Sequence, residues 1–222
     1  MKFVCSFSFF ACLLAAQPAL CQDRAESAPA NPFSLDRYLS ASAGVASTGS
    51  NTATFGVEYG EKVTPNSQAY ANLSYFDNVM TDQMRDNLAA AAAGITAITG
   101  VNRSFTGRDR GLAFTGGGKY QPGTRFRPYI GAGGGALNIE RTITEATLGD
   151  VSLEFAQQTW YGDGVVSSGS TNATKPLAEV VGGIGFVTRK MYIDVGYKYR
   201  HVFHTTTDIA LSQVAIGIGA KW

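Results

Sequence analysis

The sequence predicts an all-β protein, an eight-stranded antiparallel β-barrel that spans a membrane. Apolar and polar residues alternate with a period of two in eight segments, which is typical of strands with one apolar face. The connections between these segments alternate between short turns and long loops. Only 16% of the 222 residues are charged and 26 are glycine, whereas soluble domains usually carry about a quarter of charged residues.

Composition also limits the function classes. The formal net charge is +1 and the basic residues form no cluster, which argues against a nucleic acid partner. After the N-terminal region, no segment approaches the roughly 18 consecutive apolar residues that a membrane helix needs. The three cysteines, Cys5, Cys12 and Cys21, all lie in the first 21 residues. The rest of the chain is therefore expected to hold neither a disulfide nor a cysteine-ligated metal.

Residues 1–21 predict a secretory signal peptide. Lys2 precedes an apolar run, and small residues lead up to Cys21, after which cleavage is expected. Lipoprotein processing at Cys21 is the alternative, although Leu20 stands where a lipobox usually has a small residue. Residues 22–37, with prolines and polar filler, predict a disordered periplasmic leader, and residues 38–222 form the expected barrel.

Each expected strand places apolar residues on a lipid-facing side and small or polar residues on the other. In the fifth strand glycines occupy both faces, and we expect Leu137 and Ile139 to face lipid while Asn138 and Glu140 face the lumen. In chain order, the lipid-facing series begin and end at Leu39 and Val45, Ala53 and Tyr59, Ala71 and Tyr75, Leu112 and Tyr120, Leu137 and Ile139, Val180 and Phe186, Met191 and Tyr199, and Val214 and Trp222.

The lengths of the connections predict how the barrel is oriented. Residues 60–67, 121–126 and 189–190 are short turns, whereas residues 81–110 and 145–175 are about 30 residues each. Loops of that length are uncommon in compact soluble domains. Short turns at one end and long loops at the other are typical of bacterial outer-membrane barrels. Within the first long loop, the alanine-rich stretch Asp82–Thr99 has charges at its start and predicts a helix.

The lumen-facing side of the expected strands carries balanced charge. Eight strands enclose an interior just wide enough for side chains to fill, so acids and bases can pair across it and avoid the cost of a lone buried charge. We expect Asp194, Lys198 and Arg200 each to pair with an opposite charge, with Glu179 and Lys221 as the nearest candidates. The acids of this predicted lumen network are Glu58, Glu140, Glu179 and Asp194, and its bases are Lys119, Lys198, Arg200 and Lys221.

Aromatic residues gather near the expected strand ends, where amphipathic rings favour the membrane–water interface. This pattern predicts an interfacial belt. Its expected members are Tyr38, Tyr59, Tyr120, Tyr129, Tyr192, Tyr197, Tyr199 and Trp222.

Two further patterns favour a structural over a chemical interpretation. Residues Gly131–Ala136 fit a dinucleotide-binding fingerprint, but that motif needs a helix after the glycines, and Leu137–Arg141 continues as a strand. The only histidines, His201 and His204, lack the His-x-Ser-Asn pattern of barrel lipid A deacylases and, without a third ligand, make a weak metal site. We therefore assign no catalytic, cofactor-binding or metal-binding residue.

Two segments resemble a known family. The strand Phe126–Gly135, with its Arg-Pro-Tyr-Ile-Gly-Ala-Gly core, is similar to a strand of small OmpA-like outer-membrane barrels. The last strand resembles the terminal-aromatic signal by which the barrel assembly machinery recognises that family, with Trp222 in place of the usual phenylalanine. The residues that match this signal are Val214, Ile216, Ile218, Ala220 and Trp222. The resemblance implies export to the bacterial outer membrane, with periplasmic chaperones and the assembly machinery as partners.

The expected function is structural or surface-interacting. We expect an outer-membrane barrel without an open pore that displays its two long loops to an extracellular ligand of unknown identity, in contact with outer-membrane lipid. Neither enzymatic activity nor a cofactor is expected. A small porin for ions or small solutes is the alternative. It would need an open lumen, which the eight charged lumen-facing residues disfavour. An outer-membrane lipid-modifying enzyme is a third hypothesis.

Overall fold

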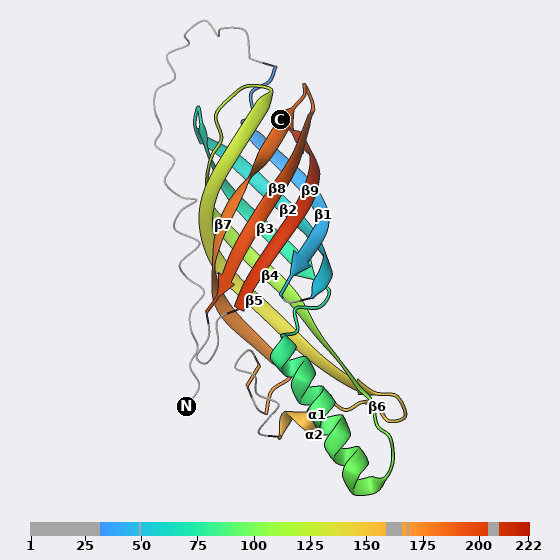
Figure 1. Ribbon diagram of the computed structural model, residues 1–222. Coiled ribbons are helices and arrows are strands. Elements are labelled where there is room, and N and C mark those ends of the chain that lie inside the picture. The colour runs from blue at the N-terminus through green and yellow to red at the C-terminus, as the bar shows by residue number, and fades with distance from the viewer. Residues whose placement is uncertain (1–31, 49, 159–165, 168, 204–208) are drawn as a thin grey trace, which may run out of the picture. The chain divides into compact units, whose positions relative to one another are not determined.

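The computed structural model describes residues 32–48, 50–158, 166–167, 169–203 and 209–222, which form a β-barrel with helical elaborations at one end (Figure 1). The predicted signal peptide and all but the last residues of the leader lie outside the described residues, as does His204. Eight long strands make the barrel wall: β1 (Arg37–Ser47), β2 (Asn51–Thr64), β3 (Ser67–Phe76), β4 (Phe105–Tyr120), β5 (Phe126–Glu145), β7 (Asn172–Val187), β8 (Met191–Val202) and β9 (Ile209–Lys221).

The eight strands close into a ring, as the sequence predicts. Neighbours pair antiparallel in the order β4-β3-β2-β1-β9-β8-β7-β5, and pairing of β4 with β5 completes the circle. The first and last strands meet along a seam that runs from Tyr38 opposite Lys221 to Ser47 opposite Ser212. Closure matters because lipid offers no hydrogen-bonding partner, so an open sheet edge cannot stand in a membrane.

The two ends of the barrel differ, as the connection lengths predict. At one end, called here the turn end, lie Arg37, Trp222 and the short connections 65–66, 121–125 and 188–190. At the other, the loop end, residues 77–104 carry helix α1 (Asp82–Thr99). The connection from β5 to β7 carries a two-residue strand, β6 (Gly149–Asp150), and the short helix α2 (Ser152–Ala156).

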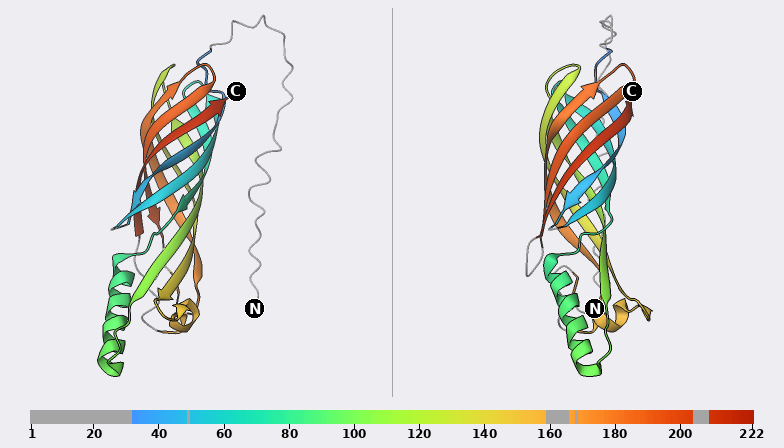
Figure 2. Two further views of the ribbon diagram at one scale, coloured as in Figure 1. Left: turned by 90° about the vertical axis from the view of Figure 1, so that its right-hand side faces the viewer. Right: turned by 45° about the vertical axis from the view of Figure 1, so that its right-hand side comes forward.

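Strands β4 and β5 run past the others at the loop end. They pair without interruption from Phe105 opposite Glu145 to Tyr120 opposite Ile130, whereas β3 pairs with β4 only as far as Gly111. The result is a projecting two-stranded ribbon, residues 105–110 with 141–145, beside which α1 stands (Figure 2). The sequence placed the start of β4 several residues too late, because polar residues such as Arg108 and Arg110 interrupt its apolar alternation.

Helix α1 occupies the predicted range, and its ends have local causes. The side chain of Thr81 accepts a hydrogen bond from the backbone N–H of Met84, which satisfies one of the free donors of the first turn. The helix ends at Gly100, whose φ of 69° is the left-handed conformation that glycine adopts without strain. Only Met84 and Leu88, in its first two turns, are buried.

The outer wall of the barrel is apolar, as expected of a surface that faces lipid. Large apolar side chains point outward from every barrel strand; Phe55, Ile130 and Ile216 are 57%, 64% and 62% exposed. A soluble domain of this size would bury such a continuous belt. No α-helix in the described ranges combines the length and hydropathy needed to cross a membrane.

The predicted phase of β5 is wrong in its second half. Leu137 and Ile139 are buried inside the barrel, and Asn138 and Glu140 are exposed outside it. Glycine has no side chain that marks a face, so the run Gly133–Gly135 hides the phase of the strand. At this height the strand also enters the projecting ribbon, where the outer surface can be polar.

The predicted aromatic belt is only partly correct. Tyr38, Tyr129 and Tyr192 point into the lumen and are at most 6% exposed. Tyr120, Tyr197, Tyr199 and Trp222 lie outside the barrel, and Tyr59 is half-buried on the same side. Proximity to a strand end does not fix a side, because a tyrosine can also serve as a hydrogen-bond donor inside a polar lumen.

Candidate functional site

The candidate site is the barrel interior, which has a polar layer toward the turn end and an apolar layer toward the loop end. On β8, for example, the inward residues change from Tyr192 and Lys198 to Val202 along the strand. On β9 they change in the same direction from Gln213 to Leu211. The polar layer holds the buried charges of the lumen, and the apolar layer fills its loop end.

Glu58 is the centre of one polar cluster. Its carboxylate accepts a hydrogen bond from the Tyr38 hydroxyl at 2.7 Å and forms ion pairs with Lys119 and with Lys198, the latter at 3.1 Å. Tyr38 stands on β1, next to the β2 strand of Glu58, whereas Lys119 on β4 and Lys198 on β8 reach Glu58 from strands that do not pair with β2, so the cluster spans the lumen. The rings of Tyr70 and Tyr129 lie 4.7 and 4.9 Å from the Lys119 ammonium.

Glu179 and Arg200 form the second cluster. It lies closer to the loop end, because Arg200 is the next inward-facing residue after Lys198 on β8. The Arg200 Nε lies 2.6 Å from Glu179 Oε2, and Glu179 also accepts hydrogen bonds from Tyr70 at 2.8 Å and Thr115 at 3.2 Å. The other guanidinium nitrogens of Arg200 donate to Ser74 and to Gln213. Burial of a charged pair costs free energy unless its remaining donors and acceptors are satisfied. Here Arg200 Nη1 and Nη2 and Glu179 Oε1 have hydrogen-bond partners, whereas Arg200 Nε and Glu179 Oε2 meet only in the ion pair.

Asp194 differs from the other lumen acids. Its Oδ2 accepts a hydrogen bond from the Tyr129 hydroxyl at 3.0 Å, but within the described ranges it has no ion pair. Glycines make room for both groups: a Cβ on Gly217 would lie 2.2 Å from Asp194 Oδ1, and one on Gly196 would lie 2.2 Å from the Tyr129 hydroxyl.

The structure brings six of the eight predicted lumen charges into the barrel and places two elsewhere. Glu140 is outside, for the reason given for β5. Lys221 points toward the turn end, where its ammonium donates to the backbone carbonyls of Pro32 and Ser34, each at 2.7 Å. Of the expected partners, Arg200 pairs with Glu179, but Lys198 pairs with Glu58, and Lys221 pairs with neither Asp194 nor any other lumen acid.

Sequence reasoning missed one buried ion pair. Arg141 donates two hydrogen bonds to Asp109, at 2.8 and 2.7 Å, and both side chains are at most 1% exposed. The two residues lie opposite one another on β4 and β5 at the base of the ribbon. Extension of the β4 alternation past Gly111 would have placed Asp109 inside.

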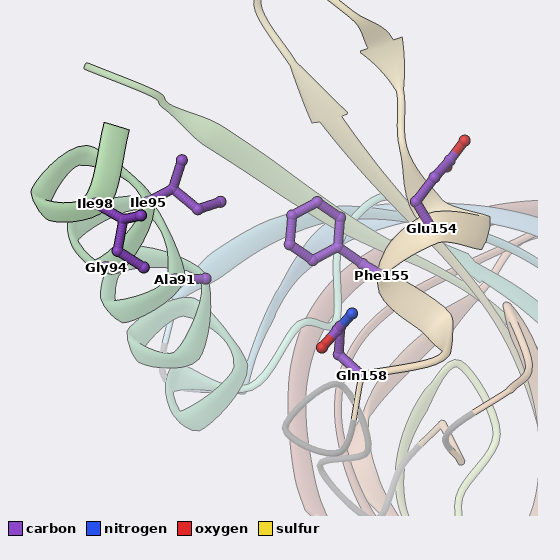
Figure 3. A pocket seen from close by; sticks show the side chains of 7 residues that line it. All are labelled: Ala91, Gly94, Ile95, Ile98, Glu154, Phe155 and Gln158. Carbon is purple, nitrogen blue, oxygen red and sulfur yellow. The ribbon is translucent and has the colours of Figure 1, made fainter. Parts of the chain in front are cut away.

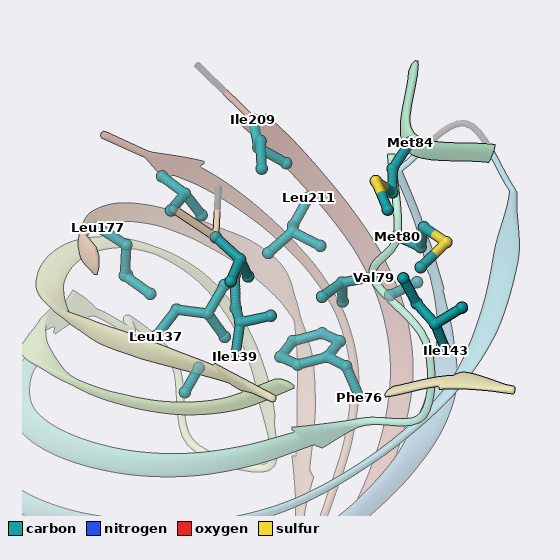
Figure 4. Packing of buried hydrophobic residues seen from close by; sticks show 14 of the residues in the cluster. Phe76, Val79, Met80, Met84, Leu137, Ile139, Ile143, Leu177, Ile209 and Leu211 are labelled. Atoms are coloured by element: carbon teal, nitrogen blue, oxygen red, sulfur yellow. The ribbon is translucent and has the colours of Figure 1, made fainter. Parts of the chain in front are cut away.

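The apolar layer fills the loop end of the lumen (Figure 4). Inward side chains from seven strands meet there, and Val79, Met80, Met84 and Leu88 from the β3–α1 segment pack over them. The side chains of Phe76, Ile139 and Leu211 are completely buried. We call this cluster the apolar plug; its strand members are Ala46, Phe76, Ala113, Leu137, Ile139, Ile143, Leu177, Val202, Ile209 and Leu211.

Beyond the plug, the two helices of the loop end face each other across an open groove of about 420 Å³ (Figure 3). Several apolar residues of the loop end are exposed: Ile98, which lines the groove, is 87% exposed, and Leu153 and Leu148 are 73% and 68% exposed. The residues that line the groove are Ala91, Gly94, Ile95, Ile98, Glu154, Phe155 and Gln158.

The glycine-rich motif and His201, the two patterns considered for chemistry, both lie in structural settings. The glycine run of the dinucleotide-like motif lies inside β5 and pairs with β4 and β7, so it is not followed by the helix N-terminus that would hold a pyrophosphate. The ring of His201 packs edge-on against Phe203, with centroids 4.7 Å apart. Among the described residues, no group of three or more potential metal ligands occurs.

Comparisons with known proteins find only distant likenesses among solved structures. No protein-family model matches the chain, and no curated protein matches it. Among solved structures it is similar to Neisserial surface protein A, with 13% identity, a TM-score of 0.48 and coverage of 84% of this chain and 96% of that one. It is also similar to Ail, the attachment invasion locus protein of Yersinia pestis, with 10% identity, a TM-score of 0.47 and coverage of 84% and 96%.

A third similar structure is the N-terminal β-barrel domain of Pseudomonas aeruginosa OprF, with 11% identity, a TM-score of 0.44 and coverage of 83% of this chain and 97% of that one. The closed antiparallel ring of eight long strands itself confirms the fold that the sequence predicts. At such low identities and TM-scores, these likenesses say nothing about what the chain binds.

Proposed function

We propose that the protein is a bacterial outer-membrane barrel that conducts no solute and presents its loop end at the cell surface as an interaction platform. The apolar plug is the observation that carries the proposal. A porin needs a continuous water-filled lumen, and even a short hydrophobic constriction blocks ions by excluding water. Here side chains from seven strands fill the lumen at the loop end.

The polar layer supports the same conclusion. Its charged side chains are not arranged as a ring of one sign along a path. They pair with one another: Glu58 with Lys119 and Lys198, and Glu179 with Arg200. Paired charges that fill a narrow lumen stabilise the barrel interior rather than select ions.

The loop end supports the second half of the proposal, because its described residues are held to the barrel by specific contacts and also expose apolar side chains. Arg103 forms an ion pair with Glu145 at 3.1 Å, which ties the segment after α1 to the ribbon. The Ser152 hydroxyl accepts a hydrogen bond from the Ile143 N–H at 2.8 Å, which ties α2 to it. Exposed apolar residues on a supported scaffold, such as Ile98 and Leu153, are typical of protein interaction sites.

Orientation follows from the two ends of the barrel. In outer-membrane barrels the short turns lie in the periplasm and the longer loops outside, so the loop end should face the exterior. The proposed assembly route uses the last strand: Val214, Ile216, Ile218 and Trp222 all point outward and are more than half exposed. The proposed partners are periplasmic chaperones and the barrel assembly machinery.

Single-channel recording in planar bilayers tests the non-conducting role. We expect the refolded barrel to insert without current steps. A matched pair of variants sharpens the test: Ile139→Ser together with Leu211→Ser places polar groups in the plug, and Leu112→Ser places one outside at a similar height on β4. Steps from the double variant alone would support the plug as the seal, whereas regular steps from the unaltered protein would establish the porin.

Cysteine labelling on intact cells tests the orientation. The chain after residue 21 contains no cysteine, so a single introduced thiol reports its own position. Ile98→Cys on α1 should react with a membrane-impermeant maleimide in whole cells, and Asn66→Cys in a short turn should react only after lysis. The reverse pattern would invert the barrel and remove the proposed surface role.

A further inference from the structure

Residues 32–36 lie across the turn end of the barrel, although the sequence predicts an unstructured leader there. The side chain of Leu35 is 1% exposed and belongs to a small apolar cluster with Tyr38, Val187 and Tyr192. The ring of Phe33 lies 4.0 Å from the guanidinium carbon of Arg125. We call residues 32–36 the strap.

Every backbone carbonyl of the strap accepts a hydrogen bond from the barrel. Lys221 on β9 donates to the carbonyls of Pro32 and Ser34, each at 2.7 Å. Arg127 on β5 donates to Phe33 at 3.2 Å. Gln68 on β3 donates to Leu35 at 3.0 Å, and the backbone N–H of Lys62 on β2 donates to Asp36 at 2.8 Å.

These contacts supply acceptors to two cations at the turn end that form no ion pair within the described residues. Arg127 is buried and Lys221 is half-buried at the turn end, and the carbonyls of the strap serve as their acceptors. Without the strap, both cations would face the open mouth of the barrel, and the Leu35 site beside Tyr192 would be exposed to water.

We propose that the strap is a latch that forms after the barrel closes and seals the polar layer on the periplasmic side. The donors stand on β2, β3, β5 and β9, and they converge on one short segment only when β1 and β9 have joined. The lumen is then closed at both ends, by the apolar plug at the loop end and by the strap at the turn end.

Accessibility of a buried thiol tests the latch. Ser40 lies inside the barrel on β1, one inward position beyond Tyr38, and is 4% exposed. Because cysteine is close to serine in size, Ser40→Cys is a suitable reporter in a region without other cysteines. In folded protein in detergent micelles, a small neutral methanethiosulfonate should modify it slowly, because a buried thiol reacts only through local opening.

Two variants should unlatch the strap in different ways. Leu35→Ser removes the buried side chain, and Lys221→Met removes the donor to two carbonyls. Each should raise the reaction rate of the reporter by about tenfold or more, which corresponds to a loss of about 1.4 kcal/mol from the closed state. Ser34→Ala keeps every anchoring carbonyl and loses only the exposed hydrogen bond of its hydroxyl to Asp36, so it should raise the rate far less than the other two variants.

Two controls make the result decisive. Asn66→Cys, in an exposed turn, should react rapidly in every background, and the shift in gel mobility on heating should show that each variant is folded. If the Ser40→Cys reporter reacts equally fast with and without the strap contacts, the strap does not seal the lumen and the proposal is overturned. If the rate rises in Leu35→Ser and in Ser34→Ala alike, the carbonyl anchors are not what holds the strap.

Discussion

Arg200 and Glu179 lie opposite each other on β8 and β7, and their side chains form an ion pair of 2.6 Å with neither group exposed to solvent. Five further side chains, from β3, β4 and β9, form hydrogen bonds with this pair. The pair therefore connects strands that are far apart around the barrel. The stability of the interior depends on such groups remaining matched.

Removal of one member of this pair should be costly. Glu179→Gln leaves the Arg200 charge buried without a counter-ion, and we expect a loss of about 3–5 kcal/mol in the free energy of unfolding. Glu179→Gln combined with Arg200→Met removes both charges and should recover much of that loss. Urea unfolding of the single and double variants in lipid vesicles would measure the coupling, and strictly additive losses would contradict it.

The two other lumen acids should respond differently to the same change. Glu58→Gln leaves Lys119 and Lys198 without their shared carboxylate, so a loss in the range of about 3–5 kcal/mol is expected. Asp194→Asn keeps an acceptor for the Tyr129 hydroxyl and removes no ion pair, so the loss should be about 1 kcal/mol or less. Equal losses for the two variants would mean that Asp194 also balances the lysines.

The apolar plug should behave as a packed protein core. Ile139→Ala creates a cavity at a completely buried site and should cost about 2–5 kcal/mol. Leu112→Ala, on the outside of β4, only shortens a lipid-facing side chain and should cost less. Chemical denaturation of both variants in the same lipid provides the comparison. A larger loss in the free energy of unfolding for Leu112→Ala would mean that the lipid-facing surface contributes more to stability than the apolar plug does.

The strap should loosen in acid through Asp36. Hydrogen bonds from the Lys62 ammonium and the Ser34 hydroxyl, and the charges of Lys62 and Lys221, hold the pKa of Asp36 below its ordinary value, although partial burial opposes them. A carboxyl with a lowered folded-state pKa stabilises the fold above its ordinary pKa of 3.8 and stops doing so as pH falls through the lowered value.

Asp36→Asn should therefore lower the temperature of the heat-induced gel shift at pH 7. The difference between this variant and the unaltered protein should shrink as pH falls below about 4. A difference that stays constant across this range would show that the carboxylate charge does not contribute to the latch.

The proposed assembly signal should depend on an aromatic terminal side chain. Trp222 is exposed on the outside of the barrel and its backbone N–H donates to the Arg37 carbonyl at 3.2 Å. Trp222→Ala should reduce the heat-modifiable barrel recovered from outer membranes, whereas Trp222→Phe should preserve it. Ile98→Ala, at the loop end, serves as the control, and an equal reduction in that variant would argue against a specific role of the terminal residue.

The sequence by itself determined the strands, their antiparallel closure, the helix Asp82–Thr99 and most of the lumen-facing charges. These are local properties: a period of two marks a strand, and the length of a connection marks the end of the barrel to which it belongs. Six predicted lumen charges lie inside for this reason, among them Glu58, Asp194 and Arg200.

Only the tertiary structure decided which charges pair and where the lumen is closed. Lys119 and Lys198 reach Glu58 across the barrel, and that choice depends on the stagger of strands that are not neighbours in sequence. Leu137 and Ile139 in the plug resemble lipid-facing residues in sequence, because protein core and lipid are both apolar surroundings. Most anchors of the strap are backbone carbonyls, which every residue possesses, and its one buried side chain, Leu35, forms no periodic pattern that would mark it in the sequence.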